Sequence, residues 1–168
     1  RIDLRRPIVG FEARTRYETL DFTRTDHDPR DFWNPIRAPR NGEFFLDPER
    51  FYLFVTKEGI CIPPECCGEI APYDTASGEF RAHYAGFFDN GFGGEMGTVG
   101  VLEVRANKMR FRLSHDQPVC RMVFEETLEV PDRLYAKEGK NNYGGYTPSL
   151  SKFFRDRQAV WDPKYWNL

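Results

Sequence analysis

Residues that bind transition metals are scarce in this sequence and poorly spaced for the task. Its 168 residues include four Cys and three His, and no two cysteines have the two-residue spacing that zinc sites commonly use. Cys66 and Cys67 are adjacent, Cys61 and Cys120 stand apart, and the His residues are scattered. This pattern predicts no zinc site and free thiols, as in a cytoplasmic protein.

Long apolar runs and an excess of one charge are also missing. No run approaches the roughly 20 residues that a membrane-spanning helix needs. Lys and Arg together number 24 and Asp and Glu 26, so the net charge at pH 7 is −2. That balance lacks the basic surface of nucleic-acid-binding proteins. We therefore expect a protein that binds neither a membrane nor a nucleic-acid polymer. The 18 Arg outnumber the 6 Lys, which suits paired contacts with phosphates but also ordinary surface ion pairs.

The sequence does contain many short β signals. Hydrophobic residues make up 40% and aromatic residues 15% of the chain, enough for a core without a disulfide or a metal. Short β-branched and aromatic runs alternate with turn residues, which predicts a mainly β fold with few short helices, as a barrel or a sandwich. The predicted strands span residues 51–56, 60–62, 79–84, 99–105, 111–113 and 119–124, with a turn at 57–59 and a short helix at 148–155.

Composition divides the chain into three segments. Residues 1–43 are dense in Arg, Asp and Pro, and we interpret them as an N-terminal arm or a connection between domains. Residues 44–130 hold the strand signals and predict a distorted β-barrel. Residues 131–168 predict a Gly-rich lid and a tail whose Trp161 and Trp166 dock on the rest of the chain. Because the first residue is Arg and not Met, we expect a piece of a longer protein.

One carboxylate lies inside the most strongly predicted strand. Because side chains alternate between the faces of a strand, Glu103 points away from Leu102 and Val104. A carboxyl group on a buried face has a raised pKa and can act as a general base. On an outward face, Glu103 would instead pair with an arginine such as Arg105 or Arg121.

Two further stretches could contribute to a site. Residues 86–94 include Asp89 and several glycines, which is typical of a tight hairpin turn in which the Asp side chain bonds the backbone. Residues 135–146 combine Lys, Asn, Tyr and Gly without the spacing of a P-loop. Such a segment could close over a phosphate-bearing ligand, or it could be a surface loop.

The order of these segments resembles that of the dCTP deaminase family, relatives of the trimeric dUTPases. The family pattern is an Asp-Pro-Gly turn, a Leu-Glu strand, a Gly-Gln-hydrophobic strand and a Lys-Tyr-Gln-Gly-Gln segment. The resemblance runs from about Glu43 to Arg155. It is carried by residues 51–56 leading into 62–64, and by residues 88–94, 101–104, 117–125 and 142–149.

The resemblance implies a dUTPase-like β-barrel that hydrolyses dCTP to dUTP and ammonia without zinc. Glu103 matches the family's general base, which activates water for attack on C4 of cytosine. Mg²⁺ would accompany the nucleotide triphosphate. The assembly would be a trimer, or a pseudo-trimer of two-copy chains. The implied substrate-binding residues are Asp89, Tyr135, Lys140, Tyr143, Gly144 and Gly145.

The sequence also departs from the family pattern. The family has Gly-Arg-Ser-Ser and a further Arg shortly before the turn, whereas residues 71–79 contain no Arg. Asn142 and Tyr146 replace the Lys and the last Gln of the family's C-terminal segment. We therefore hypothesise that the chain is the C-terminal copy of a two-copy deaminase. The alternatives are a catalytically silent half of a pseudo-trimer and a dUTPase-type pyrophosphatase that uses Asp74 or Asp89.

Overall fold

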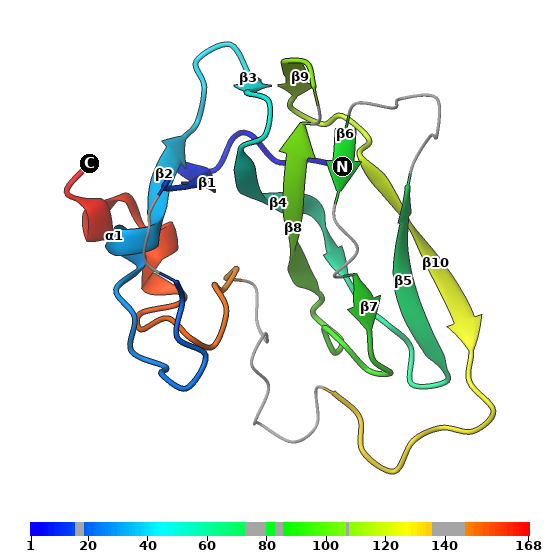
Figure 1. Ribbon diagram of the computed structural model, residues 1–168. Coiled ribbons are helices and arrows are strands. Elements are labelled where there is room, and N and C mark those ends of the chain that lie inside the picture. Colours follow the sequence, from blue (N-terminus) through cyan, green and yellow to red (C-terminus); the bar gives the residue numbers. More distant parts are fainter. Residues whose placement is uncertain (16–18, 73–79, 83–85, 107, 136–146) are drawn as a thin grey trace.

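The computed structural model is mainly β with few short helices, as predicted (Figure 1). It describes residues 1–15, 19–72, 80–82, 86–106, 108–135 and 147–168. Within these ranges the strands form three antiparallel sheets of five, three and two strands. The helical elements there are one short α-helix, α1 (Pro29–Phe32), and two 3₁₀-helices, η1 (Ala159–Trp161) and η2 (Pro163–Trp166).

The five-stranded main sheet has the order β2-β1-β4-β8-β6. Its strands are β1 (Ile8–Ala13), β2 (Trp33–Arg37), β4 (Phe51–Ile60), β6 (Phe80–Ala82) and β8 (Thr98–Ala106). The long strands β4 and β8 lie beside each other near its centre. They coincide with the predicted strands at 51–56 and 99–105, where β-branched and aromatic residues are dense.

The two smaller sheets both contribute side chains to one core cluster of the main sheet. One has the order β10-β5-β7 and consists of β5 (Cys66–Pro72), β7 (Phe87–Phe88) and β10 (Cys120–Glu126). The other pairs β3 (Glu43–Leu46) with β9 (Phe111–Ser114). Strands β9 and β10 confirm the predictions at 111–113 and 119–124. The predicted strand at 79–84 is described only over β6.

The predicted turn at residues 57–59 is wrong, because β4 continues to Ile60 through an irregularity. The register of β4 against β8 shifts between Val55 and Gly59. The buried hydroxyl of Thr56 accepts a hydrogen bond from the Gly100 amide (2.8 Å) and donates one to the Glu58 carbonyl (2.9 Å). These bonds satisfy backbone groups that the bulge removes from the ladder, so the strand bends without ending.

The helix predicted at 148–155 is also wrong. The chain there forms turns, and the amide of Leu150 donates to the carbonyl of Arg157 (3.0 Å). Leu150 and Phe154 are 1% and 5% exposed and pack against the main sheet. The backbone here follows the path that buries these two side chains. Local helix propensity is too weak to impose a helix against such tertiary contacts.

The first residues of the chain belong to the main sheet. Strand β1 pairs with β2 on one side and with β4 on the other. Ile2, Ile8 and Phe11 are at most 1% exposed. The segment interpreted as an arm or connection thus supplies two strands and part of the core. Its first strand reads as a nearly continuous apolar run because both of its faces are covered.

Core side chains lie on both faces of the main sheet. Tyr52 and Phe54 pack with Leu102 and Val104 on one face, and Leu53 packs in a second cluster on the other. This alternation follows from the two-residue period of strands. Burying each large side chain stabilises the fold by roughly 1.5–3 kcal/mol.

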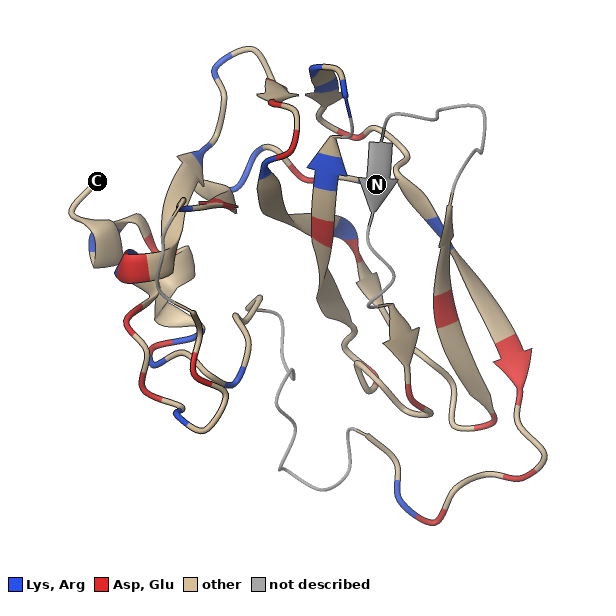
Figure 2. Ribbon diagram, viewed as in Figure 1, with Lys and Arg blue, Asp and Glu red and all other residues tan. Residues whose placement is uncertain are grey.

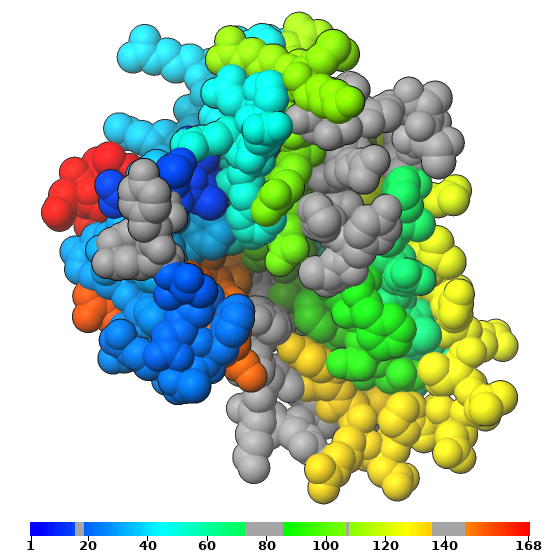
Figure 3. Space-filling model, in the orientation of Figure 1, coloured from blue at the N-terminus to red at the C-terminus, as the bar shows by residue number. Residues whose placement is uncertain are grey.

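The C-terminal tail docks on the second cluster, as predicted from its tryptophans. The rings of Phe11 and Trp161 lie 4.6 Å apart, and those of Phe11 and Trp166 lie 5.7 Å apart. The space-filling view shows the blue N-terminal and the red and orange C-terminal residues packed together on one side of the molecule (Figure 3). The two ends of the chain therefore build one face of the core together.

Candidate functional site

A cavity of about 610 Å³ lies between the main sheet and residues from both ends of the chain. Strands β4 and β8 of the main sheet line it, with Ala13 of β1 and Trp33 of β2, and residues 147–151 line it as well. Aromatic side chains dominate its lining: Phe32, Trp33, Phe51, Phe87, Phe88, Phe92, Tyr135 and Phe154. A cavity of this size and character suits a small ligand with an aromatic ring.

Glu103 lines this cavity from the centre of β8. It aligns with Leu53 of β4, which in turn aligns with Phe11 of β1, so all three lie in one row across the sheet. As predicted, Leu102 and Val104 pack on the opposite face. Glu103 is half-buried beside apolar neighbours.

Neither arginine considered as an ion-pair partner neutralises Glu103. The guanidinium of Arg105 lies over the ring of Phe51, 5.0 Å from its centroid. Arg121 belongs to β10 in another sheet, where it pairs with Ala71. Among the described residues, no cation forms an ion pair with the Glu103 carboxylate.

The turn after β7 places Asp89 at the cavity. The buried side chain of Asn90 donates to the carbonyl of Pro64 (2.8 Å) and to the hydroxyl of Thr127 (3.0 Å). Gly93 has a φ of +81°, and a Cβ there would lie 1.9 Å from the carbonyl oxygen of Ile60. The turn is thus held by two long-range contacts and requires glycine at this position. The exposed Asp89 belongs to this turn, and its backbone carbonyl accepts from the Phe92 amide (3.0 Å).

An aromatic row continues from this turn to Tyr135. The rings of Phe88 and Phe92 lie 4.8 Å apart edge to face, and those of Phe92 and Tyr135 lie 5.2 Å apart. The amide of Tyr135 donates to the carbonyl of Asn90 (3.0 Å). The fold therefore brings together Glu103, Asp89 and Tyr135, which lie up to 46 residues apart in the sequence, around one cavity.

The other predicted binding residues lie outside the described part of the chain. These are Lys140, Tyr143, Gly144 and Gly145. Asp74, considered for a pyrophosphatase, and the stretch matched to the Gly-Arg-Ser-Ser segment also fall there, apart from the first residues of that stretch.

Sequence reasoning missed the cavity residues that come from the two ends of the chain. Arg14, Trp33, Ser149 and Phe154 all line it. No spacing in the sequence links these positions to Glu103. The adjacent aromatic residues Phe32 and Trp33 lie in an otherwise polar segment. They indicate that this segment packs against the rest of the chain, but they do not indicate a binding site.

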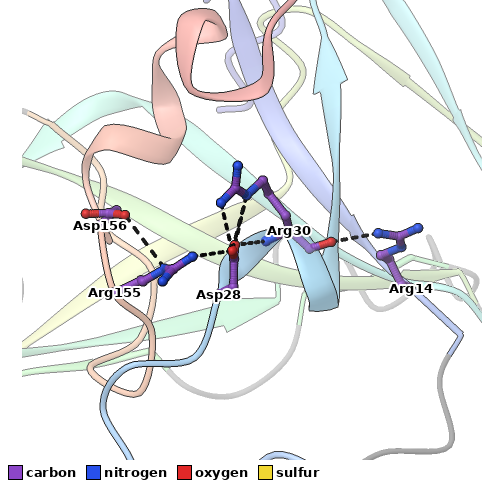
Figure 4. A network of polar contacts seen from close by, with 5 residues as sticks. All are labelled: Arg14, Asp28, Arg30, Arg155 and Asp156. Carbon is purple, nitrogen blue, oxygen red and sulfur yellow. Dashed lines mark hydrogen bonds and ion pairs between the residues drawn. The ribbon is translucent and has the colours of Figure 1, made fainter.

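A polar network ties the two ends of the chain together beside the cavity (Figure 4). Asp28 caps α1 by accepting from the Arg30 amide (2.9 Å), and its carboxylate also binds the Arg30 and Arg155 guanidinium groups. The Arg30 side chain, its amide and Arg155 lower the pKa of the Asp28 carboxyl to about 2, against the raising effect of partial burial. Figure 2 shows acidic and basic residues interspersed along this N-terminal segment.

Metal-ligating groups do not cluster in the described residues, where no set of three or more His, Cys, Asp or Glu could hold an ion. The four cysteines are free thiols, and burial raises the pKa of Cys120. None of the helices described is long and apolar enough to cross a membrane.

Comparison with known proteins connects this chain to an enzyme family. The family model for the C-terminal domain of 2′-deoxycytidine 5′-triphosphate (dCTP) deaminase matches residues 1–154. The chain belongs to this dCTP deaminase family. The matched range includes the first 43 residues, in agreement with their place in the main sheet.

A solved structure supports the same assignment. The crystal structure of dCTP deaminase from Agrobacterium tumefaciens is 40% identical and superimposes with a TM-score of 0.74 over 78% of this chain. The match covers 42% of the Agrobacterium chain, less than half of its length. The fold is thus that of a dCTP deaminase of the dUTPase-like type. No curated protein matches the chain.

Proposed function

We propose that the protein carrying this chain hydrolyses dCTP to dUTP and ammonia, with Glu103 as the general base and without zinc. The observation that supports this most is the position of the Glu103 carboxylate, half-buried in an aromatic-lined cavity and without an ion-pair partner among the described residues. The family and the Agrobacterium relative support the choice of dCTP.

The proposed reaction uses Glu103 to move protons. Its carboxylate takes a proton from a water molecule, whose oxygen forms a bond to C4 of cytosine. Glu103 passes that proton to N3 of the ring. The bond from C4 to the amino nitrogen then breaks, and the nitrogen leaves as ammonia after accepting the second proton of the water. General base catalysis of this kind typically accelerates a reaction by about 10²- to 10⁴-fold.

The remaining predicted residues would bind the substrate. Asp89 and Tyr135 lie at the same cavity as Glu103. Lys140, Tyr143, Gly144 and Gly145 would contact the phosphates, as the family resemblance implies. Mg²⁺ would arrive with the triphosphate as part of the substrate.

The test is ammonia release from dCTP by the intact protein. Replacing Glu103 by Gln keeps the shape of the side chain but removes the base, so kcat should fall on the order of 10²-fold or more. Glu69→Gln is the matched control, because Glu69 is exposed on β5 in a different sheet. Full deamination by the Glu103→Gln protein would contradict the proposed role and favour a catalytically silent half. Release of pyrophosphate without ammonia would favour the dUTPase-type alternative.

We further propose that this chain is the C-terminal copy of a protein with two related domains, which assemble as a trimer or pseudo-trimer with sites between copies. Two observations support this proposal. The chain matches 42% of the Agrobacterium chain, and residues 71–79 lack the family's Arg-containing segment, which an upstream copy would supply. The test is the sequence that precedes Arg1 in the intact protein. A stretch there without a second domain-sized copy would refute this organisation.

A further inference from the structure

Acidic residues outnumber basic residues among the described side chains that line the cavity. Among the described residues that line it, Asp89 and Glu103 are acidic and Arg14 is the one cation. A nucleotide triphosphate brings several more negative charges to the same cavity. Without a cation, its phosphates would meet like charge, which disfavours binding.

The position of Arg14 is fixed by two hydrogen bonds to backbone carbonyls. It directly follows β1, where its amide donates to the carbonyl of Phe32 (2.8 Å). Its guanidinium Nη1 donates to the carbonyl of Arg30 (2.6 Å), as Figure 4 shows. Both acceptors are neutral carbonyls, so the Nη1 bond orients the guanidinium and neither bond compensates its charge.

Neighbouring arginines in the same network differ from Arg14 in this respect. Arg30 and Arg155 both bind the carboxylate of Asp28 (Figure 4). No carboxylate forms an ion pair with Arg14 among the residues that the structure describes. A guanidinium has five N–H donors, so the remaining donors of Arg14 can bind a phosphate through two parallel hydrogen bonds.

We propose that Arg14 binds the phosphate groups of the nucleotide in this cavity. This inference rests on the proposed function, since it takes a deoxynucleoside triphosphate as the ligand. Arg14 is exposed whereas Glu103 is half-buried. Strongly hydrated phosphates fit the exposed rim beside Arg14, and the base fits the aromatic interior beside Glu103. Arg14 thereby supplies a phosphate-binding cation from the N-terminal segment of the chain itself.

The experiment compares two ligands that share a base and a sugar but differ in phosphates. Dissociation constants of dUTP with Mg²⁺ and of 2′-deoxyuridine are measured by titration calorimetry, the nucleoside by displacement, on the intact protein. The variants are Arg14→Gln and the control Arg24→Gln, which removes the same charge from an exposed ion pair with Asp26 in the same segment. Circular dichroism and thermal unfolding establish that each variant is folded.

Arg14→Gln should weaken dUTP binding by about 10- to 100-fold, because it removes charge-assisted hydrogen bonds to the phosphates. Binding of 2′-deoxyuridine should be unchanged, and Arg24→Gln should bind both ligands as the unmodified protein does. If the Arg14→Gln and unmodified proteins bind dUTP equally well, the proposed role of Arg14 is refuted, while the proposed function stands. The same holds if Arg14→Gln weakens the binding of dUTP and of 2′-deoxyuridine by the same factor. If the unmodified protein does not bind dUTP and releases no ammonia from dCTP, the proposed function itself fails.

Discussion

Asp28 offers the sharpest test of how the two ends of the chain are held together. Its carboxylate binds Arg30 beside it in the sequence and Arg155, 127 residues away. Asp28→Asn preserves an oxygen that can accept from the Arg30 amide at the start of α1 but removes the charge. The substitution therefore isolates the ion pairs from the helix cap.

The magnitude follows from the pKa of Asp28. The ordinary pKa of an Asp carboxyl is 3.8, and that of Asp28 is lowered to about 2 in the folded protein. Since one pKa unit corresponds to about 1.4 kcal/mol, the charged form contributes at most about 2–3 kcal/mol. The side chain is 20% exposed, and solvent screening reduces this to about 1–2 kcal/mol.

The sign of the pH dependence is set by the lowered pKa. The stabilisation is fully present above pH 3.8, the unfolded value, and is lost as the pH falls through about 2, the folded value. Unmodified protein should thus be more stable than Asp28→Asn by about 1–2 kcal/mol at pH 7, and this difference should shrink between pH 4 and pH 2.

The free energy of unfolding is measured by urea titration, with tryptophan fluorescence as the probe. Trp33, Trp161 and Trp166 all pack in the cluster that joins the chain ends. Asp26→Asn is the control, because the one ion pair of Asp26 among the described residues is exposed, with Arg24, and its loss should leave the free energy of unfolding unchanged. A difference between unmodified protein and Asp28→Asn that stays constant from pH 7 to pH 2 would refute the electrostatic explanation.

Two further predictions concern the frame of the cavity, and urea unfolding measures both. Gly93→Ala should cost about 2–4 kcal/mol, because its Cβ would lie 1.9 Å from the Ile60 carbonyl oxygen at a positive φ. Gly42→Ala, also at a positive φ but with its nearest atom 3.7 Å away, should cost only about 1 kcal/mol, and equal losses would contradict this reasoning. Asn90→Ala removes the bond to Pro64 among others and should cost about 1–3 kcal/mol, whereas a neutral effect would mean that the turn holds its shape without these bonds.

The position of the candidate base could be read from the sequence. Alternation of side chains along a strand places Glu103 opposite Leu102 and Val104 in any regular strand. The glycines near Asp89 likewise identify a tight turn, because few other residues adopt a positive φ without strain. Both predictions depend on local geometry, and the strand at Glu103 and the positive-φ glycines after Asp89 have the expected form. The predicted hairpin is wrong, because β7 and β8 belong to different sheets.

The site that surrounds Glu103 could not be read in the same way. Asp89 and Tyr135 were placed by family resemblance, and the fold brings both to the cavity. Arg14 and Phe154 were missed because nothing in their local sequence differs from a surface arginine or an ordinary core phenylalanine. Their place at the cavity depends on contacts between distant parts of the chain.

The sequence by itself determined the mainly β class, the central strands and the face on which Glu103 lies, since these follow from the two-residue period of strands and from turn chemistry. Only the tertiary structure decided that β1 joins the main sheet. It also decided that residues 147–154 pack on the face of this sheet that carries Leu53 and Glu103. Contacts such as that between Phe11 and Trp161 span almost the whole chain. Burial at such contacts outweighs local preference, so a segment that is polar and irregular in the sequence becomes one side of the cavity.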